Sequence, residues 1–328
     1  MTLAPPAFDD VLAARGRIAP YLRETALNNY PALDELVGAE TWVKHENHHP
    51  VCNFKVRGGV NLVSQLSDDE RRRGVITAST GNHGQSIALA GRIFGVRAII
   101  CVPEGANPVK VGSIRGLGGG IVEHGRDFDD AREHCEALAE EHGYRYVHSG
   151  NEPDLIAGVG THTVEALERQ PDLDVLIVPI GGGSGAAGAC VAAAALRPGL
   201  RVIGVQSEAA PAAYRTWKEG RPVEDRMETF AEGLATRVPF ELPQEIMAAL
   251  LDDFILVSDD EIRGAMVAMI ESTRNLVEAA GAASLAGALL LRERLAGRRV
   301  ALVCSGGNVS VPQLADVLAR AEGSAPKA

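Results

Sequence analysis

The sequence predicts an α/β protein of two domains, each with a parallel-type sheet flanked by helices. Short apolar strands alternate with helices in two series, over residues 75–141 and 152–304, and such a βαβ series folds into a helix-covered parallel sheet. The length of 328 residues accommodates two domains of ordinary size. Glycine is abundant (36 residues) and aromatic residues make up only 4%, which suits helices packed tightly on a sheet.

Charge and cysteine content exclude several classes of protein. Acidic residues outnumber basic ones by 43 to 32, so no basic stripe is available to neutralise phosphates. We therefore expect neither a nucleic-acid partner nor a membrane partner. The five cysteines are scattered, as is typical of a reducing compartment, and the longest apolar run is shorter than the about 20 residues that span a bilayer. The expected location is cytoplasmic.

The amino-terminal part offers a helix, a strand and a possible metal site. Residues 8–22 have helical apolar spacing, and residues 40–46 alternate as a strand does. The histidines and the cysteine that follow suggest metal ligands: His45, His48, His49 and Cys52. However, Pro50 breaks the helix that would align them, and no second ligand pair follows at the spacing of structural zinc sites. We therefore expect no metal.

The remaining elements follow the alternation in chain order. The predicted strands cover residues 75–78, 98–102, 121–123, 175–180, 201–206 and 300–304. The predicted helices run from after residue 85 to residue 93, from after residue 108 to the glycines at 118–120, and over residues 127–141, 152–169, 186–196, 259–273 and 284–295. Residues 239–243, which begin and end with proline, are predicted to form a loop.

Lys55 is the candidate reactive residue. It lies between Phe54 and Val56, and an apolar wall favours the neutral amine, which is the form that condenses with an aldehyde to give a Schiff base. Taken alone, the pattern also fits a surface lysine before a Gly-Gly turn. Loops elsewhere in the chain favour the reactive interpretation.

A glycine run after the strand at residues 175–180 is typical of a phosphate site. Residues 181–185 can point successive backbone N–H groups at one anion, and the helix that follows presents its positive end. A nucleotide is the competing interpretation. The run lacks the Lys-Ser/Thr ending of a Walker loop and departs from the dinucleotide fingerprint, so a monophosphate is favoured.

Two further strand ends carry polar loops. Ser79 and Thr80, with the amides around Gly81, can bind a carboxylate, and the Asn82 amide can bond a phenolate-like oxygen. The alternative for Ser79 or Thr80 is a helix cap. In the loop 305–308, Ser305 places a hydroxyl at the end of the last strand, where it could face a ring nitrogen.

These four features match the aldehyde, phosphate, phenolic oxygen and pyridine nitrogen of pyridoxal 5′-phosphate (PLP). The sequence resembles the fold-type II PLP enzymes, with a tryptophan synthase beta-like fold, in the threonine/serine dehydratase and serine racemase family. The resemblance runs from about Val11 to Pro312. The matching motifs are Lys44–Asn47, Asn53–Gly58, Ser79–Gln85, Gly181–Gly185, Ala231–Gly233 and Ser305–Asn308.

The resemblance implies a role for each site residue. Lys55 would carry PLP and later remove the substrate's Cα proton, and Ser79 would be the second catalytic residue. Phe54 and Gly233 would contact the cofactor, Asn82 its 3′ oxygen and Ser305 its ring nitrogen. The residues implied at the phosphate are Gly181, Gly182, Gly183, Ser184 and Gly185. The residues implied at the substrate carboxylate are Ser79, Thr80, Gly81 and His83.

The resemblance also implies architecture and activity. We expect a large PLP-binding domain of residues 1–50 and 153–328, a small inserted domain of residues 51–152, and a homodimer. The implied activity is a dehydratase, or ammonia-lyase, that converts threonine, serine or a bulkier 3-hydroxy amino acid such as 3-phenylserine to a 2-keto acid and ammonia. Amino-acid racemase is the alternative, because Thr80 stands where racemases carry a serine base. A binding protein that has lost its chemistry is a third, disfavoured by the intact Lys55.

Two departures from the family pattern qualify these expectations. Asn53 replaces the serine that usually precedes Phe-Lys, so we expect an altered pocket rim there and at Cys52. The racemase branch has a divalent-ion site formed by acids, whereas this chain offers Gln206 and Ala212 at the matching places, so we expect no such ion.

Overall fold

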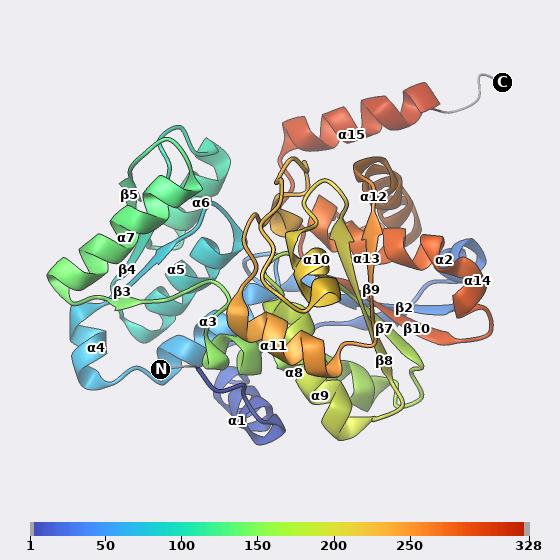
Figure 1. Ribbon diagram of the computed structural model, residues 1–328, viewed down its shortest axis with the longest axis horizontal. Helices are drawn as coiled ribbons and strands as arrows, with labels where there is room; N and C mark the ends of the chain where they lie inside the picture. The colour runs from blue at the N-terminus through green and yellow to red at the C-terminus, as the bar shows by residue number, and fades with distance from the viewer. Residues whose placement is uncertain (1–2, 325–328) are drawn as a thin grey trace.

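The computed structural model describes residues 3–324 and contains two sheets covered by helices (Figure 1). The six-stranded sheet has the order β1 (Leu27–Asn29), β2 (Glu40–His45), β10 (Arg299–Cys304), β7 (Val175–Pro179), β8 (Arg201–Ser207), β9 (Asp253–Val257). The four-stranded sheet has the order β5 (Gly120–Glu123), β4 (Ala98–Val102), β3 (Val75–Ala78), β6 (Arg145–Tyr146). Every neighbouring pair is parallel except β1 with β2. The predicted fold class is confirmed; the domain boundaries stay a prediction.

Helices cover both faces of the six-stranded sheet because its strands are apolar on both sides. In β7, Leu176 and Val178 pack into one buried cluster, and Val175 and Ile177 into the other. The helices of the first face are α1 (Phe8–Ile18), α8 (Pro153–Arg169), α9 (Ser184–Leu196), α10 (Ala212–Glu219) and α11 (Glu241–Leu250). Those of the second are α2 (Pro31–Val37), α12 (Asp259–Thr273), α13 (Ala279–Leu290), α14 (Arg292–Leu295) and α15 (Val311–Ser324).

The four-stranded sheet is built in the same way. In β4, Ile100 and Val102 face one cluster and Ile99 and Cys101 the other. The helices of the first face are α3 (Lys55–Ser64), α5 (Asn82–Phe94) and α6 (Pro108–Gly116); α7 (Phe128–His142) covers the second. A short helix, α4 (Asp68–Arg73), buries none of its residues. Two 3₁₀ turns complete the described chain, η1 (Glu46–His48) and η2 (Glu232–Leu234).

Two predicted elements are wrong in position. Residues 239–243 are not a loop throughout, because α11 begins at Glu241 and includes Pro243 in its first turn. Proline is tolerated there, since the first N–H groups of a helix have no partner within it. The helix predicted at residues 284–295 is α13, which begins at Ala279. Its small residues are buried on nearly all sides, so no amphipathic period marks its start.

A cluster of four charged side chains is buried where the two sheets meet. Arg57 of α3 bonds Glu46 through Nε and Glu165 of α8 through one terminal nitrogen, each at 2.6 Å. Lys44 of β2 pairs with Glu165 as well. All four are at most 7% exposed. Burial alone would raise the pKa of Glu46, but Arg57 and His49 outweigh it and hold this pKa well below its usual range.

Removing one member of this cluster should destabilise the protein strongly. Arg57→Met leaves Glu46 and Glu165 buried without their shared cation, and breaking a buried pair in this way costs about 3–5 kcal/mol. Denaturant unfolding followed by circular dichroism measures the loss. The control is Arg72→Gln, which removes a solvent-exposed pair with Asp69 and should cost less than about 1 kcal/mol. Equal losses in the two variants would contradict the role given to the buried cluster.

Candidate active site

The predicted loops lie at the carboxyl ends of parallel strands. β7 and β10 are neighbours in one sheet, so the glycine loop 181–185 and the loop 305–308 leave the same edge side by side. The Ser79 loop leaves β3 in the other sheet. Carboxyl ends of open parallel sheets are where such folds bind ligands.

The segment before Lys55 is fastened to the loop after β10. The Phe54 N–H donates to the Ser305 carbonyl at 3.0 Å, and the Gly307 N–H donates to the Cys52 carbonyl at 2.8 Å. Asn53 is fully buried: its Oδ1 accepts from the Lys55 N–H at 3.1 Å, and its Nδ2 donates to the Val51 carbonyl. The Asn53 side chain therefore shapes its own loop and not the rim of a pocket, contrary to expectation. Lys55 and Ser305 are brought together.

Lys55 is the first residue of α3, and its amine is close to the Phe54 ring, 5.2 Å from the centroid. Burial lowers the pKa of Lys55 to about 8, although the nearby Glu278 carboxylate acts in the opposite direction. About a tenth of the amine is therefore neutral at pH 7, compared with less than about a thousandth for an exposed lysine. Such an amine can act as a nucleophile or a base.

The glycine loop has the geometry of an anion cradle. Gly183 has φ +90°, a conformation that favours glycine, and α9 begins at Ser184 and directs its amino terminus at the loop. A Cβ on Gly185 would lie 3.0 Å from the Phe54 ring, and a Cβ on Gly181 would collide with the Gly233 carbonyl. The predicted phosphate loop therefore lies directly against both Phe54 and Gly233. Together these residues fit a phosphorylated ring.

The two hydroxyl groups of the Ser79 loop differ in their hydrogen bonds. Ser79 Oγ accepts from the N–H groups of Gly81 (3.3 Å) and Gly84 (2.9 Å), so it bonds a first-turn N–H of α5 although the N-cap residue is Gly81 and neither Ser79 nor Thr80. Its proton remains available for donation. Thr80 is half-buried, and no group among residues 3–324 bonds its hydroxyl.

His83 is turned away from a ligand role. Its Nε2 donates to Thr77 Oγ1 at 3.0 Å, because the Thr77 hydroxyl itself donates to the Val147 carbonyl. Burial lowers the pKa of His83 to about 3, so the ring is neutral. The His83 Nε2 therefore forms a hydrogen bond within the four-stranded sheet. None of the contacts of the His83 side chain supports the predicted role at the substrate carboxylate.

Asn82 connects the two sheets through a residue that is absent from the predicted site. Asn82 Nδ2 donates to Glu278 Oε1 at 2.7 Å, and Asn82 Oδ1 accepts from Asn308 Nδ2 at 2.7 Å. One N–H of the Asn82 amide remains for a ligand oxygen. Burial raises the pKa of Glu278, against the Asn82 hydrogen bond and the nearby lysines. The sequence signal for Glu278 is a single acid directly before the apolar run of α13.

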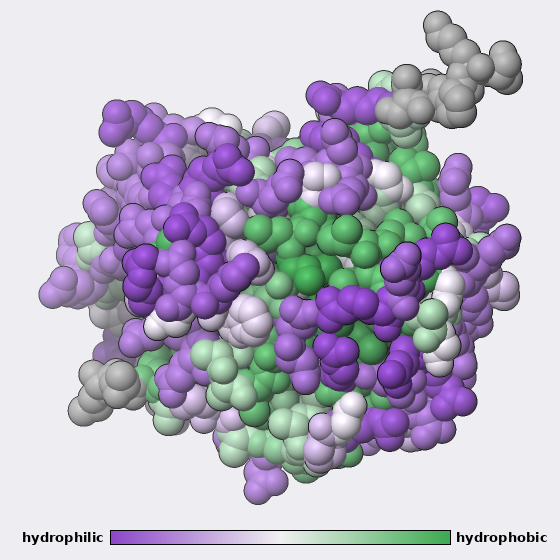
Figure 2. Space-filling view, turned by 45° about the vertical axis from the view of Figure 1, so that its right-hand side comes forward, coloured by the Kyte–Doolittle hydropathy of each residue, from purple (hydrophilic) through white to green (hydrophobic). Residues whose placement is uncertain are grey.

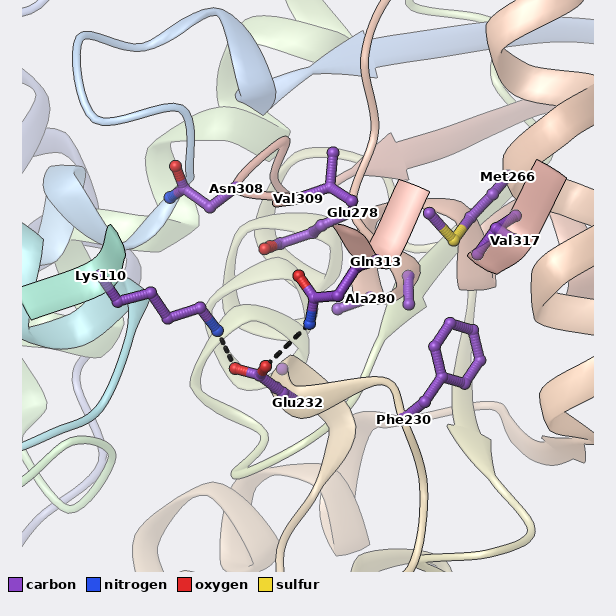
Figure 3. A pocket seen from close by; sticks show the side chains of 12 residues that line it. Lys110, Phe230, Glu232, Met266, Glu278, Ala280, Asn308, Val309, Gln313 and Val317 are labelled. Atoms are coloured by element: carbon purple, nitrogen blue, oxygen red, sulfur yellow. Dashed lines mark hydrogen bonds and ion pairs between the residues drawn. The ribbon is translucent and has the colours of Figure 1, made fainter. Parts of the chain in front are cut away.

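A pocket beside Glu278 joins the same two parts of the molecule (Figure 3). Lys110 of α6 forms an ion pair with Glu232, and Gln313 of α15 donates to the same carboxylate at 3.0 Å. Figure 3 shows these polar groups on one side of the pocket and Phe230 and Met266 on the other. The Lys110–Glu232 pair was not predicted, because nothing near either residue in the sequence indicates its partner.

The histidine-rich segment does not gather ligands. His45 Nε2 bonds the Tyr30 hydroxyl at 2.8 Å, and His48 Nε2 bonds Asn275. Across the described part of the chain, no three His, Cys, Asp or Glu side chains are arranged to hold a metal ion. Nor is any helix in residues 3–324 long and apolar enough to cross a membrane.

Comparison with known proteins identifies relatives over almost the whole chain. L-threonine ammonia-lyase of Thermotoga maritima is 37% identical over 306 residues, which are 92% of this chain and 76% of that protein. L-threo-3-hydroxyaspartate ammonia-lyase of Saccharomyces cerevisiae is 37% identical over 318 residues, which are 97% of this chain and 98% of that protein. The structure of maize serine racemase superposes with a TM-score of 0.91 at 30% identity, covering 98% of this chain and 99% of that one.

The family model described as pyridoxal-phosphate dependent enzyme matches residues 18–306. This match includes Lys55, the glycine loop, the Ser79 loop and Ser305, so the resemblance predicted from these motifs is confirmed, and with it the cofactor. The chain belongs to the family of pyridoxal-phosphate dependent enzymes.

Proposed function

We propose that the chain is an ammonia-lyase that converts a 3-hydroxy amino acid to a 2-keto acid and ammonia. Threonine and serine are the first substrates to test, with bulkier analogues such as 3-phenylserine. The observation that carries the proposal is the half-buried Lys55, whose amine has a pKa of about 8, in a molecule whose strand-end loops include a phosphate loop and a hydroxyl-bearing carboxylate loop. Two relatives at 37% identity are ammonia-lyases.

Residues from both sheets would hold the cofactor. The Gly181–Gly185 amides and the α9 terminus bind its phosphate, Phe54 and Gly233 border its ring, Asn82 meets its phenolic oxygen and Ser305 its ring nitrogen. Bound PLP supplies an electron-withdrawing ring that stabilises negative charge at the substrate's Cα.

The chain's own residues would carry out binding and proton transfer. The Ser79 hydroxyl and the Thr80 hydroxyl donate to the substrate carboxylate, because Ser79 Oγ already accepts two N–H groups and keeps its proton for this use. The neutral Lys55 amine takes the Cα proton. The β-hydroxyl and the proton removed from Cα together leave as one water molecule, and the resulting enamine adds water to give the 2-keto acid and ammonium.

Racemisation is the second candidate, and one observation favours it. The half-buried Thr80 hydroxyl has no partner among the described residues, and serine racemase from maize has the same fold. A racemase needs a second base on the face opposite Lys55. A threonine hydroxyl gives up its proton only with help, and its methyl group restricts χ1. We therefore rank this activity second.

We further infer the assembly and the location. The large domain comprises residues 1–50 and 153–328 and the small domain residues 51–152, and the protein is a cytoplasmic homodimer. Exposed apolar side chains support pairing: Leu276 is 57% exposed, Val311 81% and Leu318 42%. Figure 2 shows hydrophobic residues gathered on the face next to α15. An apolar area of this kind is typical of a protein–protein contact.

Lys55→Ala should abolish keto-acid formation from threonine and serine. The loss should be at least about 10³-fold, because the variant lacks both the cofactor anchor and the general base. Borohydride reduction of the wild type, followed by peptide mapping, should find the cofactor on Lys55. Lys218→Ala, which alters an exposed lysine, is the control and should keep full activity. A reduced adduct on another lysine would refute the assignment.

The Lys55 amine should react as a lysine with a lowered pKa. In the cofactor-free protein, acylation of Lys55 by a small amine reagent should rise with pH around a midpoint near 8, since only the neutral amine reacts. Glu278→Gln should move the midpoint lower, because the carboxylate that favours the ammonium form is gone. Mass spectrometry of the Lys55 peptide measures both. An unchanged midpoint in Glu278→Gln would show that the carboxylate does not act on Lys55.

Thr80 separates the lyase from the racemase. Thr80→Ala should lower kcat/KM for keto-acid formation by no more than about tenfold, the value of one hydrogen bond. Ser79→Ala should be more damaging, because it also removes the acceptor of two backbone N–H groups. Chiral chromatography of recovered substrate and a keto-acid assay follow the two activities. Racemisation as fast as ammonia release in the wild type, lost selectively in Thr80→Ala, would put the racemase first.

A further inference from the structure

His148 lies at the active site without a part in the chemistry described so far. It follows Val147, whose carbonyl accepts from the Thr77 hydroxyl at 2.7 Å, so it lies beside the end of β3 where the Ser79 loop begins. Burial lowers the pKa of His148 to about 4, and the positive charge of Lys55 contributes to this shift. The ring is therefore neutral near neutral pH.

The hydrogen bonds of His148 determine its tautomer. Nδ1 accepts from the N–H groups of Gly150 at 3.1 Å and Asn151 at 2.9 Å, so the lone pair is on Nδ1 and the proton on Nε2. Among residues 3–324 no group accepts a hydrogen bond from Nε2. The neutral ring thus holds a donor in a fixed orientation.

The rings of His148 and Phe240 form one continuous surface, the His148–Phe240 wall. The two rings meet edge to face with centroids 4.8 Å apart. Phe240 also packs so closely on Gly150 and on Gly182 of the glycine loop that neither has room for a Cβ. The wall therefore extends from the strand beside the Ser79 loop to the phosphate loop.

This wall is where a substrate side chain would lie. In the proposed function the substrate directs its Cα proton at the Lys55 amine and binds its carboxylate in the Ser79 loop. The His148–Phe240 wall borders both this loop and the phosphate loop, so we assign the remaining substituent to it; there Phe240 is apolar and His148 Nε2 is the polar group.

We propose that His148 Nε2–H donates a hydrogen bond to the β-hydroxyl of the substrate and so selects and orients the leaving group. This inference rests on the proposed lyase function. His148 keeps its proton throughout: the hydroxyl takes the electron pair of its C–O bond and becomes water with the proton that Lys55 removed from Cα. His148 is thus a specificity residue, and β-substituents that accept no hydrogen bond gain nothing from it.

The test compares two leaving groups in two variants of the holoenzyme. His148→Asn keeps an acceptor for the Gly150 and Asn151 N–H groups but has no donor at the Nε2 position, whereas His148→Gln restores a donor there. For serine and threonine, His148→Asn should lose about tenfold in kcat/KM and His148→Gln should regain most of it. For β-chloroalanine, whose chloride accepts hydrogen bonds weakly, both variants should remain within about threefold of the wild type.

The outcomes separate this inference from the proposed function. Equal losses on both substrates in His148→Asn, or no loss on either, would overturn the hydrogen bond and leave the lyase intact. A wild type that forms keto acid from β-chloroalanine but from no 3-hydroxy amino acid would overturn the lyase, and the His148 inference with it. The PLP absorbance of each variant verifies that the site is assembled.

Discussion

The buried charges of Lys44, Glu46, Arg57 and Glu165 are the constraint on which the site depends. They come from β2, η1, α3 and α8, so all four segments must be in place before all of the charges are compensated. A buried ion pair adds little net stability, but a buried charge that lacks its partner is very destabilising. The cluster therefore disfavours misplaced segments more strongly than it stabilises the correct arrangement. Arg57 lies two residues after Lys55 in the first turn of α3. The ion pairs of Arg57 therefore also fix the position of the helix start that carries Lys55.

The two sheets are connected over the site by polar contacts and not by a continuous core. Asn82 bonds Glu278 and Asn308, and Lys110 pairs with Glu232, each contact joining a helix of the four-stranded sheet to the other part of the molecule. Away from the site the two parts pack closely, because Leu155 of α8 belongs to the buried cluster of the four-stranded sheet, and Gly58 of α3 and Gly158 of α8 have no room for a Cβ. At the site itself only these polar contacts would break if the Ser79 loop and α6 moved away from Glu278 and Glu232, which suits a site that must admit a substrate and then exclude water.

Strand-end loops were predictable, whereas contacts between them were not. β4 and β3 have the predicted bounds, and the loops at Ser79, Gly181 and Ser305 follow strands as expected, because apolar runs and glycine-rich turns are local signals. Glu278, Phe240 and His148 lie far from Lys55 in the sequence, and their importance depends on distances set by the packing of α13, α11 and β6. Asn53 illustrates the limit: the substitution is visible in the sequence, but only the structure shows the side chain bonded within its own loop.

The reactivity of Lys55 depends on the contact between the two sheets as well as on burial. Burial favours the neutral amine and Glu278 the charged one, and their balance gives a pKa of about 8. Glu278 is half-buried, and the Asn82 hydrogen bond helps to keep it ionised. Asn82 begins α5, next to the loop that would bind the substrate carboxylate. Movement of that loop away from Glu278 would withdraw this hydrogen bond and favour a protonated carboxyl, and Lys55 would lose the negative charge beside it. The carboxylate loop and the base are thus coupled through one carboxyl group.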